Sequence, residues 1–361
     1  MDRKHFYGVD LLRGLCALGI VVYHYPHFAE QHPGYRLLEP VYLHGMLFVQ
    51  CFWMISGFVF SHVYAGSSIT AGEFALRRFA RLYPLHIITL ITITITQGVS
   101  LKYLGTTQVI GNFDLYHFVM NVLFITPGWG YDGSFNSPIW SVNVEEIVYA
   151  IFFVFCAAIF RWRAALPVLL ALLAAAIAFV PAGRVNLFGL CGFYFFAGSA
   201  LYYFLTRTMA AYPLQSALLS VIVAVAVFSV LTSFPGWALG SLYFLLPFVF
   251  FTPVMVVAIC IDQSGALHRP LVRLRWVGDA TYSIYLWHFP VQVAILTGIA
   301  IFGLPATLFG SRFALIGWIV LMLAIGRASF VYLERPIQKA ILALGRKRQQ
   351  LLPQGAGVTN L

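Results

Sequence analysis

The chain has 361 residues, of which 61% are hydrophobic and only 9% charged, and its mean hydropathy is +0.85. Soluble globular domains carry about 25% charged residues, so this composition excludes an ordinary water-soluble protein and also a disordered one. The net charge of +10 marks the cytoplasmic ends of membrane helices and not a nucleic-acid site, because no basic segment is interleaved with exposed aromatics in a soluble module.

Hydropathy predicts an all-α polytopic membrane bundle of about ten transmembrane helices, because about 20 mainly apolar residues cross the hydrocarbon core. The predicted spans are residues 9–27, 42–64, 82–100, 143–161, 164–181, 187–206, 214–232, 241–261, 281–302 and 309–333. Residues 115–126 are apolar but short, so they span, re-enter or lie at the interface. The longer segment 101–141 is typical of a structured loop, and it contains Pro127, Gly128, Gly130 and Asp132.

The basic residues orient this bundle. With the N-terminus in the cytoplasm, 17 of them lie at inner ends, whereas Arg36, Lys102, Arg184 and Arg312 lie in outer loops and Arg327 lies within the last span. This asymmetry predicts that both termini are cytoplasmic. We expect one transmembrane domain over residues 1–340 and a basic, disordered cytoplasmic tail over 341–361.

The cysteines predict neither disulfides nor a metal site. All five lie in apolar stretches without CxxC spacing, so we interpret them as small buried side chains. They are Cys16, Cys51, Cys156, Cys191 and Cys260.

The first span contains Asp10, Arg13 and His24, and ionisable groups in a membrane are candidates for function. Asp10 and Arg13 are three residues apart, so they face the same way on a helix and can pair. Arg13 and His24 are eleven residues apart, about three turns or 16 Å of rise. They therefore share one face, which favours a functional His24 over a merely structural one.

Arg78 and Arg81 lie in the segment RRFARLYPLH at residues 77–86. Being three apart, they project together at the cytoplasmic surface. A guanidinium binds oxyanions through two parallel N–H···O hydrogen bonds, so the pair suits phosphate groups. The alternative is a positively charged flank of a span.

Glu145 and Glu146 lie near the start of the fourth span, in SPIWSVNVEEIVY at residues 137–149. Adjacent carboxylates there are costly unless they face a cavity or a partner, although they also complement the helix dipole. The topology places both toward the outer side, at the depth of His24. A carboxylate-oriented imidazole is therefore possible, with helix capping as the alternative.

The ninth span begins with GDATYSIYLWHFP at residues 278–290. His288 lies about 15 Å from the cytoplasmic end of this helix, so it is a second mid-membrane histidine, in contact with substrate or structural. Tyr282, Tyr285 and Trp287 are alternatively interface and packing aromatics.

Six sequence blocks together resemble the acyltransferase-3 family of integral membrane acyltransferases. In the family's order they are GVDLLRGLCALGIVVYHY, CFWMISGFVFS, RRFARLYPL, IWSVNVEEIVY, YSIYLWHFP and LERP. The family usually has Leu and Ser where Val142 and Asn143 stand, and Glu145 stays aligned as its characteristic acid. The resemblance is to the stand-alone branch, without a fused periplasmic hydrolase-like domain.

This resemblance implies transfer of an acyl group, commonly acetyl from acetyl-CoA, to a hydroxyl of a carbohydrate at the outer side of a bacterial cytoplasmic membrane. Acyl-CoA is then a co-substrate, and we expect no permanently bound cofactor or metal. The expected partners are acyl-CoA, membrane lipids and a carbohydrate or lipid-linked glycan acceptor, and no nucleic acid. Acceptor choice is expected in the outer loops 28–41 and 101–138.

The resemblance also implies residue roles. His24 falls in the catalytic histidine position, and Glu145 is expected to orient it. Arg13, Arg78 and Arg81 fall in the arginine motifs and would hold the CoA phosphates, while the thin pantetheine arm extends inward. Substrate contacts are assigned to Trp140, Tyr285 and His288.

Two other classes of protein are alternatives. A transporter or flippase of glycans would use the same buried charges as a substrate path, but it more often has an inverted repeat, and none is visible. A purely structural scaffold does not explain six ordered motifs.

Overall fold

The computed structural model describes residues 5–28, 33–64, 66–125, 133–179, 186–208, 213–232, 246–265 and 267–351. Within these ranges the chain is helical and has no strand, and a single isolated bridge joins Asn112 to Ser134. The predicted all-α class is confirmed.

Each predicted span overlaps a helix in the described part of the chain. The helices are α1 (Tyr7–Tyr23), α3 (Gly45–Tyr64), α4 (Ala71–Leu104), α6 (Trp140–Trp162), α7 (Ala165–Phe179), α8 (Leu187–Thr208), α9 (Pro213–Thr232), α11 (Leu246–Ser264), α13 (Thr281–Phe302) and α14 (Arg312–Ser329). Among the described residues, eight helical segments are long and apolar enough to cross a membrane. The chain is therefore a multi-pass membrane protein.

Shorter elements connect or extend these helices. They are η1 (Tyr25–Phe28), α2 (Tyr35–Leu43), α5 (Leu115–Val122), η3 (Ser137–Ile139), α12 (His268–Asp279), η5 (Ala306–Phe309), η6 (Phe330–Glu334) and α15 (Arg335–Leu351). Helix α5 has 8 residues and rises about 12 Å. The hydrocarbon core is about 30 Å thick, so α5 does not span it.

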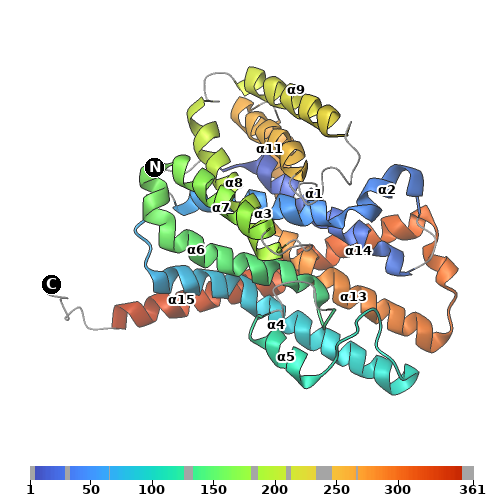
Figure 1. Cartoon of the computed structure of the whole chain (residues 1–361). Helices are drawn as coiled ribbons and strands as arrows, with labels where there is room; N and C mark the ends of the chain where they lie inside the picture. Colours follow the sequence, from blue (N-terminus) through green and yellow to red (C-terminus); the bar gives the residue numbers. More distant parts are fainter. Residues whose placement is uncertain are drawn as a thin grey trace.

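Helix α1 lies at the centre of the bundle, which is how Arg13 and His24 come to be surrounded by other elements (Figure 1). It packs against α3, α11, α12 and α13, and near its end against α2 and α14. Helix α13 in turn lies between α4 and α14. Residues from the first and the last third of the sequence therefore meet around α1.

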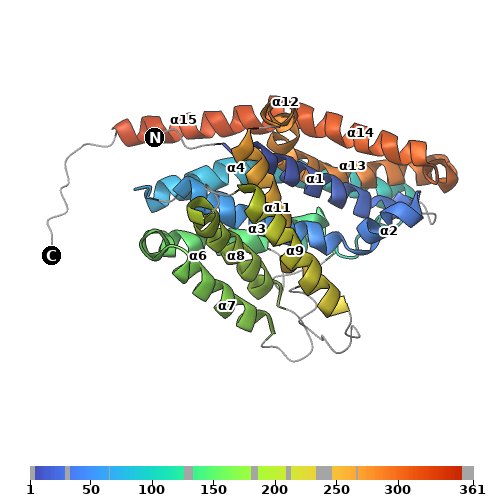
Figure 2. The same ribbon diagram turned by 90° about the horizontal axis from the view of Figure 1, so that it is seen from above.

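Helix α15 continues the direction of α14 along one side of the molecule (Figure 2). It packs on α4, where a side chain at Gly345 would overlap Leu76. Residues 341–351 are thus helical where the sequence predicted a disordered tail, because this helix has α4 to pack against. Residues 352–361 lie outside the described part.

Helix α4 has 34 residues and is about 51 Å long, so it extends beyond a hydrocarbon core. Its cap is the Thr70 hydroxyl, which accepts from the Glu73 N–H at 3.3 Å, and Gly105 ends it with φ 72°. The alternating run ITITIT at residues 91–96 is typical of a strand in water. Here Thr92, Thr94 and Thr96 donate to carbonyls four residues back, which satisfies their hydroxyls within the helix.

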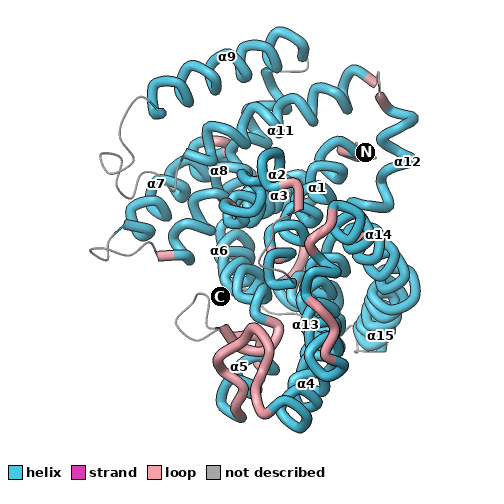
Figure 3. Tube along the Cα trace, turned by 90° about the vertical axis from the view of Figure 1, so that its right-hand side faces the viewer, coloured by secondary structure: helices cyan, strands magenta, loops and turns pink. Residues whose placement is uncertain are grey.

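The loops around α5 fold beside α4 (Figure 3). The Tyr83 hydroxyl donates to the Val122 carbonyl at 2.7 Å, and the Gln97 amide donates to the Gln108 carbonyl at 2.8 Å. These contacts confirm a structured loop over the described part of 101–141. Residues 126–132, including Pro127, Gly128, Gly130 and Asp132, lie outside it, as do 29–32 of the first outer loop.

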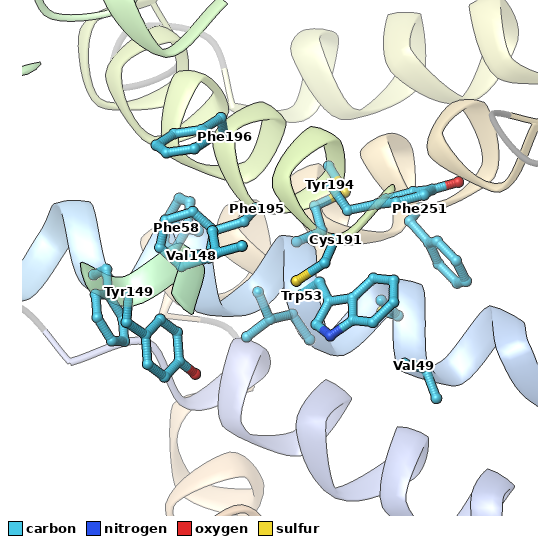
Figure 4. Packing of buried hydrophobic residues seen from close by; sticks show 14 of the residues in the cluster. Val49, Trp53, Phe58, Val148, Tyr149, Cys191, Tyr194, Phe195, Phe196 and Phe251 are labelled. Carbon is cyan, nitrogen blue, oxygen red and sulfur yellow. The ribbon is translucent and has the colours of Figure 1, made fainter. Parts of the chain in front are cut away.

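Helices α3 and α8 pack closely on each other, and side chains of both contribute to the hydrophobic cluster in Figure 4. A Cβ at Gly57 would overlap the Phe195 carbonyl, and one at Gly198 would overlap the Met54 carbonyl. Ser61 and Ser199 share a hydrogen bond of 2.7 Å across the same contact. Small residues let membrane helices approach in this way.

Candidate active site

A cavity of about 300 Å³ opens between α1, α3, α4, α6 and α13, and we call it the inner cavity. Most of its polar lining is charged or hydroxyl-bearing. The polar side chains that line it are Arg13, Ser56, Arg78, Arg81, Ser141, Glu145, Tyr149, Thr281, Tyr282, Tyr285 and Gln338. All three predicted arginines and Glu145 therefore share one site.

Aromatic rings hold the Arg78 guanidinium in place. Its carbon lies 4.9 Å from the centroid of the Phe60 ring and 5.8 Å from that of Tyr149. Its Nη2 donates to the Tyr64 hydroxyl at 3.3 Å. Cation–π contacts of this kind fix a planar group better than they fix an ammonium.

Arg81 is ion-paired with Glu334, a buried residue in the π-helix η6. The same carboxylate accepts a hydrogen bond of 2.6 Å from the Ser283 hydroxyl. Glu334 belongs to the sequence block LERP, and no role is predicted for it from the sequence. An acid near the end of an apolar span was the available signal.

Arg13 lies on the first helix at the edge of the inner cavity. Its Nη1 is 3.8 Å from Asp10, as the three-residue spacing predicts. Asp10 also lies 2.6 Å from His5 Nε2. Asp10 is thus shared between two basic side chains.

Glu145 lies among the arginines and is not joined to His24. Its neighbours in the inner cavity are Ser56 and Tyr149, and its Oε1 is buried without a hydrogen-bond partner in the described structure. The sequence placed Glu145 and His24 at one depth. Glu145 instead faces the inner cavity, whose lining it shares with Arg78.

His24 follows the last residue of α1, and other histidines surround it. Its ring centroid lies 5.1 Å from that of His288 and 5.7 Å from that of His27. Its backbone carbonyl accepts a hydrogen bond of 2.7 Å from the Gln292 amide. Its Nδ1 is buried with no partner among the described residues, so this nitrogen has an unused hydrogen-bonding position.

His288 links His24 to the inner cavity. Its Nδ1 lies 2.5 Å from the Tyr285 carbonyl, which can only accept, so Nδ1 carries the hydrogen. Its Nε2 is buried and has no partner in the described ranges. The ring of Tyr285 lies 5.7 Å from His288 and lines the inner cavity. Tyr285, His288 and His24 therefore form a continuous row.

Trp140 is not among the residues that line the inner cavity. Its ring packs edge to face on Trp53 at 6.1 Å between centroids, and Trp53 is the tryptophan that lines the cavity. The indole of Trp53 donates to the Ser141 carbonyl at 3.3 Å. Of the predicted substrate contacts, Tyr285 faces the inner cavity directly.

Comparisons with known proteins show which family the chain belongs to. Residues 6–331 match the acyltransferase-3 family, described as an acyltransferase domain. The exopolysaccharide production protein ExoZ of Rhizobium meliloti is 30% identical over 319 residues, 84% of this chain and 92% of the relative. The peptidoglycan O-acetyltransferase OatA of Listeria monocytogenes is 24% identical over 94% of this chain and 56% of its own length. No solved structure matches.

The helical bundle and its arginine-lined cavity define a polytopic membrane protein with an internal site. The chain belongs to the acyltransferase-3 family, as its six sequence blocks predicted. It is a membrane acyltransferase, and this membership favours an enzyme over the transporter or flippase alternative.

Proposed function

We propose that this protein is an O-acetyltransferase of a bacterial cytoplasmic membrane. It moves an acetyl group from cytoplasmic acetyl-CoA to a hydroxyl of an extracytoplasmic carbohydrate such as an exopolysaccharide or O-antigen. Support for a carbohydrate acceptor comes from the names of ExoZ and OatA. Support for a cytoplasmic donor comes from the basic residues that gather at the predicted inner ends of the helices.

The observation that carries the proposal is the row from the inner cavity to His24. Arg13, Arg78 and Arg81 line the cavity, and they bind the anionic donor. The acyl thioester reaches inward past Tyr285. His24 and His288 lie beyond it, where an acceptor from the outer side meets the thioester.

The transfer itself needs a base for the acceptor hydroxyl. An imidazole nitrogen of His24 takes the hydroxyl proton as the oxygen attacks the thioester carbonyl, and a C–O bond forms. The C–S bond then breaks, and the thiolate of CoA takes the proton back from the imidazolium. General base catalysis of this kind contributes about 10²–10⁴-fold. An alternative route acetylates His24 first and passes the group on in a second step.

A deletion strain tests the proposal. It is complemented with the wild type, with His24→Ala or with His44→Ala, which removes an exposed histidine outside the site. We expect mass spectrometry to find acetylated surface glycans with the wild type and His44→Ala but not with His24→Ala. The purified His24→Ala protein should still bind CoA. Full acetylation with His24→Ala would remove His24 from the chemistry, and glycans that never depend on the protein would overturn the proposed acceptor.

A further inference from the structure

A second cavity, of about 350 Å³, lies beside the first at the end of the bundle that carries α12 and α15. We call it the rim cavity. The charged and amide side chains that line it are Arg13, Arg81, Asp279, Arg335, Gln338 and Lys339. Its volume is in the range of small-molecule sites, roughly 300–1,000 Å³.

The cations of the rim cavity differ in whether they already have an acidic partner. Arg81 is paired with Glu334, and Arg13 lies 3.8 Å from Asp10. Arg335 and Lys339 have no acidic partner among the described residues. Asp279, the acid in the lining, lies 3.7 Å from Arg275. Two cations thus face the cavity uncompensated.

The spacing of Arg335 and Lys339 strengthens this point. They are four residues apart on α15, so their side chains lie on one face of the helix, and like charges at that spacing repel. Both residues are exposed. An anion held between them would remove the repulsion and gain two charge-assisted hydrogen bonds.

The rim cavity and the inner cavity are adjacent. Arg13, Arg81 and Gln338 line both of them. A ligand with a highly charged head and a thin, neutral arm would fit this pair, with its head at the rim and its arm inside. Inside, Arg78 is already held against Phe60 and Tyr149, and Arg81 against Glu334. A highly charged head would gain additional cationic partners at the rim, where Arg335 and Lys339 line the cavity.

We propose that the rim cavity binds the phosphate-bearing nucleotide half of acyl-CoA, with Arg335 and Lys339 as its phosphate ligands. This inference rests on the proposed function, because it names the donor's second subsite. The chemistry recognised is a phosphate ester bound between two cations. The headgroup of an anionic lipid also has a phosphate ester. Continuity with the inner cavity favours the nucleotide.

The test compares acetyl-CoA with acetyl-pantetheine, a donor that lacks the nucleotide. In the purified Arg335→Gln/Lys339→Gln protein we expect KM for acetyl-CoA to rise about tenfold for each cation removed. KM for acetyl-pantetheine and kcat should not change. The matched control is Arg346→Gln/Lys347→Gln, which removes two exposed cations of the same helix outside the cavity. An equal rise in KM for both donors, or none for acetyl-CoA, would overturn the inference.

Two further measurements separate the sources of phosphate and the two proposals. Adenosine 3′,5′-bisphosphate should bind the wild type and compete with acetyl-CoA, and the double variant should lose this binding, in nanodiscs of phosphatidylcholine alone. If bisphosphate binds neither protein, and only phosphatidylglycerol distinguishes them, the site is a lipid site and the inference is wrong. A wild type that binds the bisphosphate but transfers acetyl from neither donor would contradict the proposed function and leave the nucleotide site standing.

Discussion

His24 and His288 come from opposite ends of the sequence, and their imidazole rings lie 5.1 Å apart between centroids inside the bundle. Each ring keeps one buried nitrogen, His24 Nδ1 and His288 Nε2, without a hydrogen-bond partner in the described part. Leaving such an atom unsatisfied costs about 1–3 kcal/mol. A hydroxyl-bearing substrate would supply the missing partners, which supports the proposal that the acceptor binds at these two nitrogens.

The first prediction concerns which nitrogen of His288 matters. His288→Gln places an amide near Nε2, whereas His288→Asn places one near Nδ1, the atom that donates to Tyr285. We expect kcat for acetyl transfer to fall about 10²-fold in His288→Asn and less in His288→Gln, because a misplaced contact at the reacting groups has an effect of that size. Steady-state kinetics with a fixed donor checks this.

KM for acetyl-CoA should change little in either variant, because His288 does not line the inner cavity, where the donor is proposed to bind. If His288→Asn is the more active of the two, the bond to the Tyr285 carbonyl is what counts. His288 would then be a structural residue of α13.

The second prediction concerns Arg78. Arg78→Lys keeps the charge but loses the planar group that lies 4.9 Å over the Phe60 ring. We expect KM for acetyl-CoA to rise about tenfold, because a desolvated cation–π contact is worth up to about 2 kcal/mol. Arg77→Lys is the matched control, since its exposed side chain pairs with Glu73 on its own helix and surface pairs contribute about 0–1 kcal/mol. An equal change of KM in Arg78→Lys and Arg77→Lys would count against donor binding by Arg78.

The third prediction concerns the buried pair of Arg81 and Glu334. Glu334→Leu leaves Arg81 without its acid and Ser283 without its acceptor, so we expect the free energy of unfolding to fall by about 3 kcal/mol. Adding Arg81→Leu should recover part of this loss, because the unpaired charge is removed. Thermal unfolding in detergent micelles measures both. If the loss of unfolding free energy in the double variant equals the sum of the losses in Glu334→Leu and in Arg81→Leu, the ion pair contributes nothing to stability.

The sequence predicts the helices of this protein well because a membrane admits few alternatives. Every backbone group must be satisfied within a span, so hydropathy alone locates the helices. The run ITITIT at residues 91–96 illustrates this, since the hydroxyls of Thr92, Thr94 and Thr96 donate to helix carbonyls despite the strand-like alternation.

The site is harder to predict because it depends on how each helix is rotated about its own axis. Counting residues along the spans places Glu145 toward the outer side and Arg78 and Arg81 at the cytoplasmic surface, yet all three line one cavity. The neighbours of Glu145 depend on how α6 packs against the other helices, which the count does not give. The ion pair between Arg81 and Glu334 is similarly non-local, since it joins α4 to η6. By contrast, the pair of Asp10 and Arg13 lies within one helix, and its spacing alone predicts it.

The last prediction uses two glycines that undergo the same chemical change. Gly57→Ala places a methyl group against the Phe195 carbonyl of α8, whereas Gly98→Ala, on α4, meets nothing within 4 Å. We expect Gly57→Ala to lower the free energy of unfolding by about 1–3 kcal/mol through overpacking. Gly98→Ala should raise it by about 0.5–1 kcal/mol, because alanine loses less backbone entropy in a helix. Opposite shifts in the unfolding temperature of the purified proteins would confirm the close contact of α3 with α8, and shifts of the same sign would contradict it.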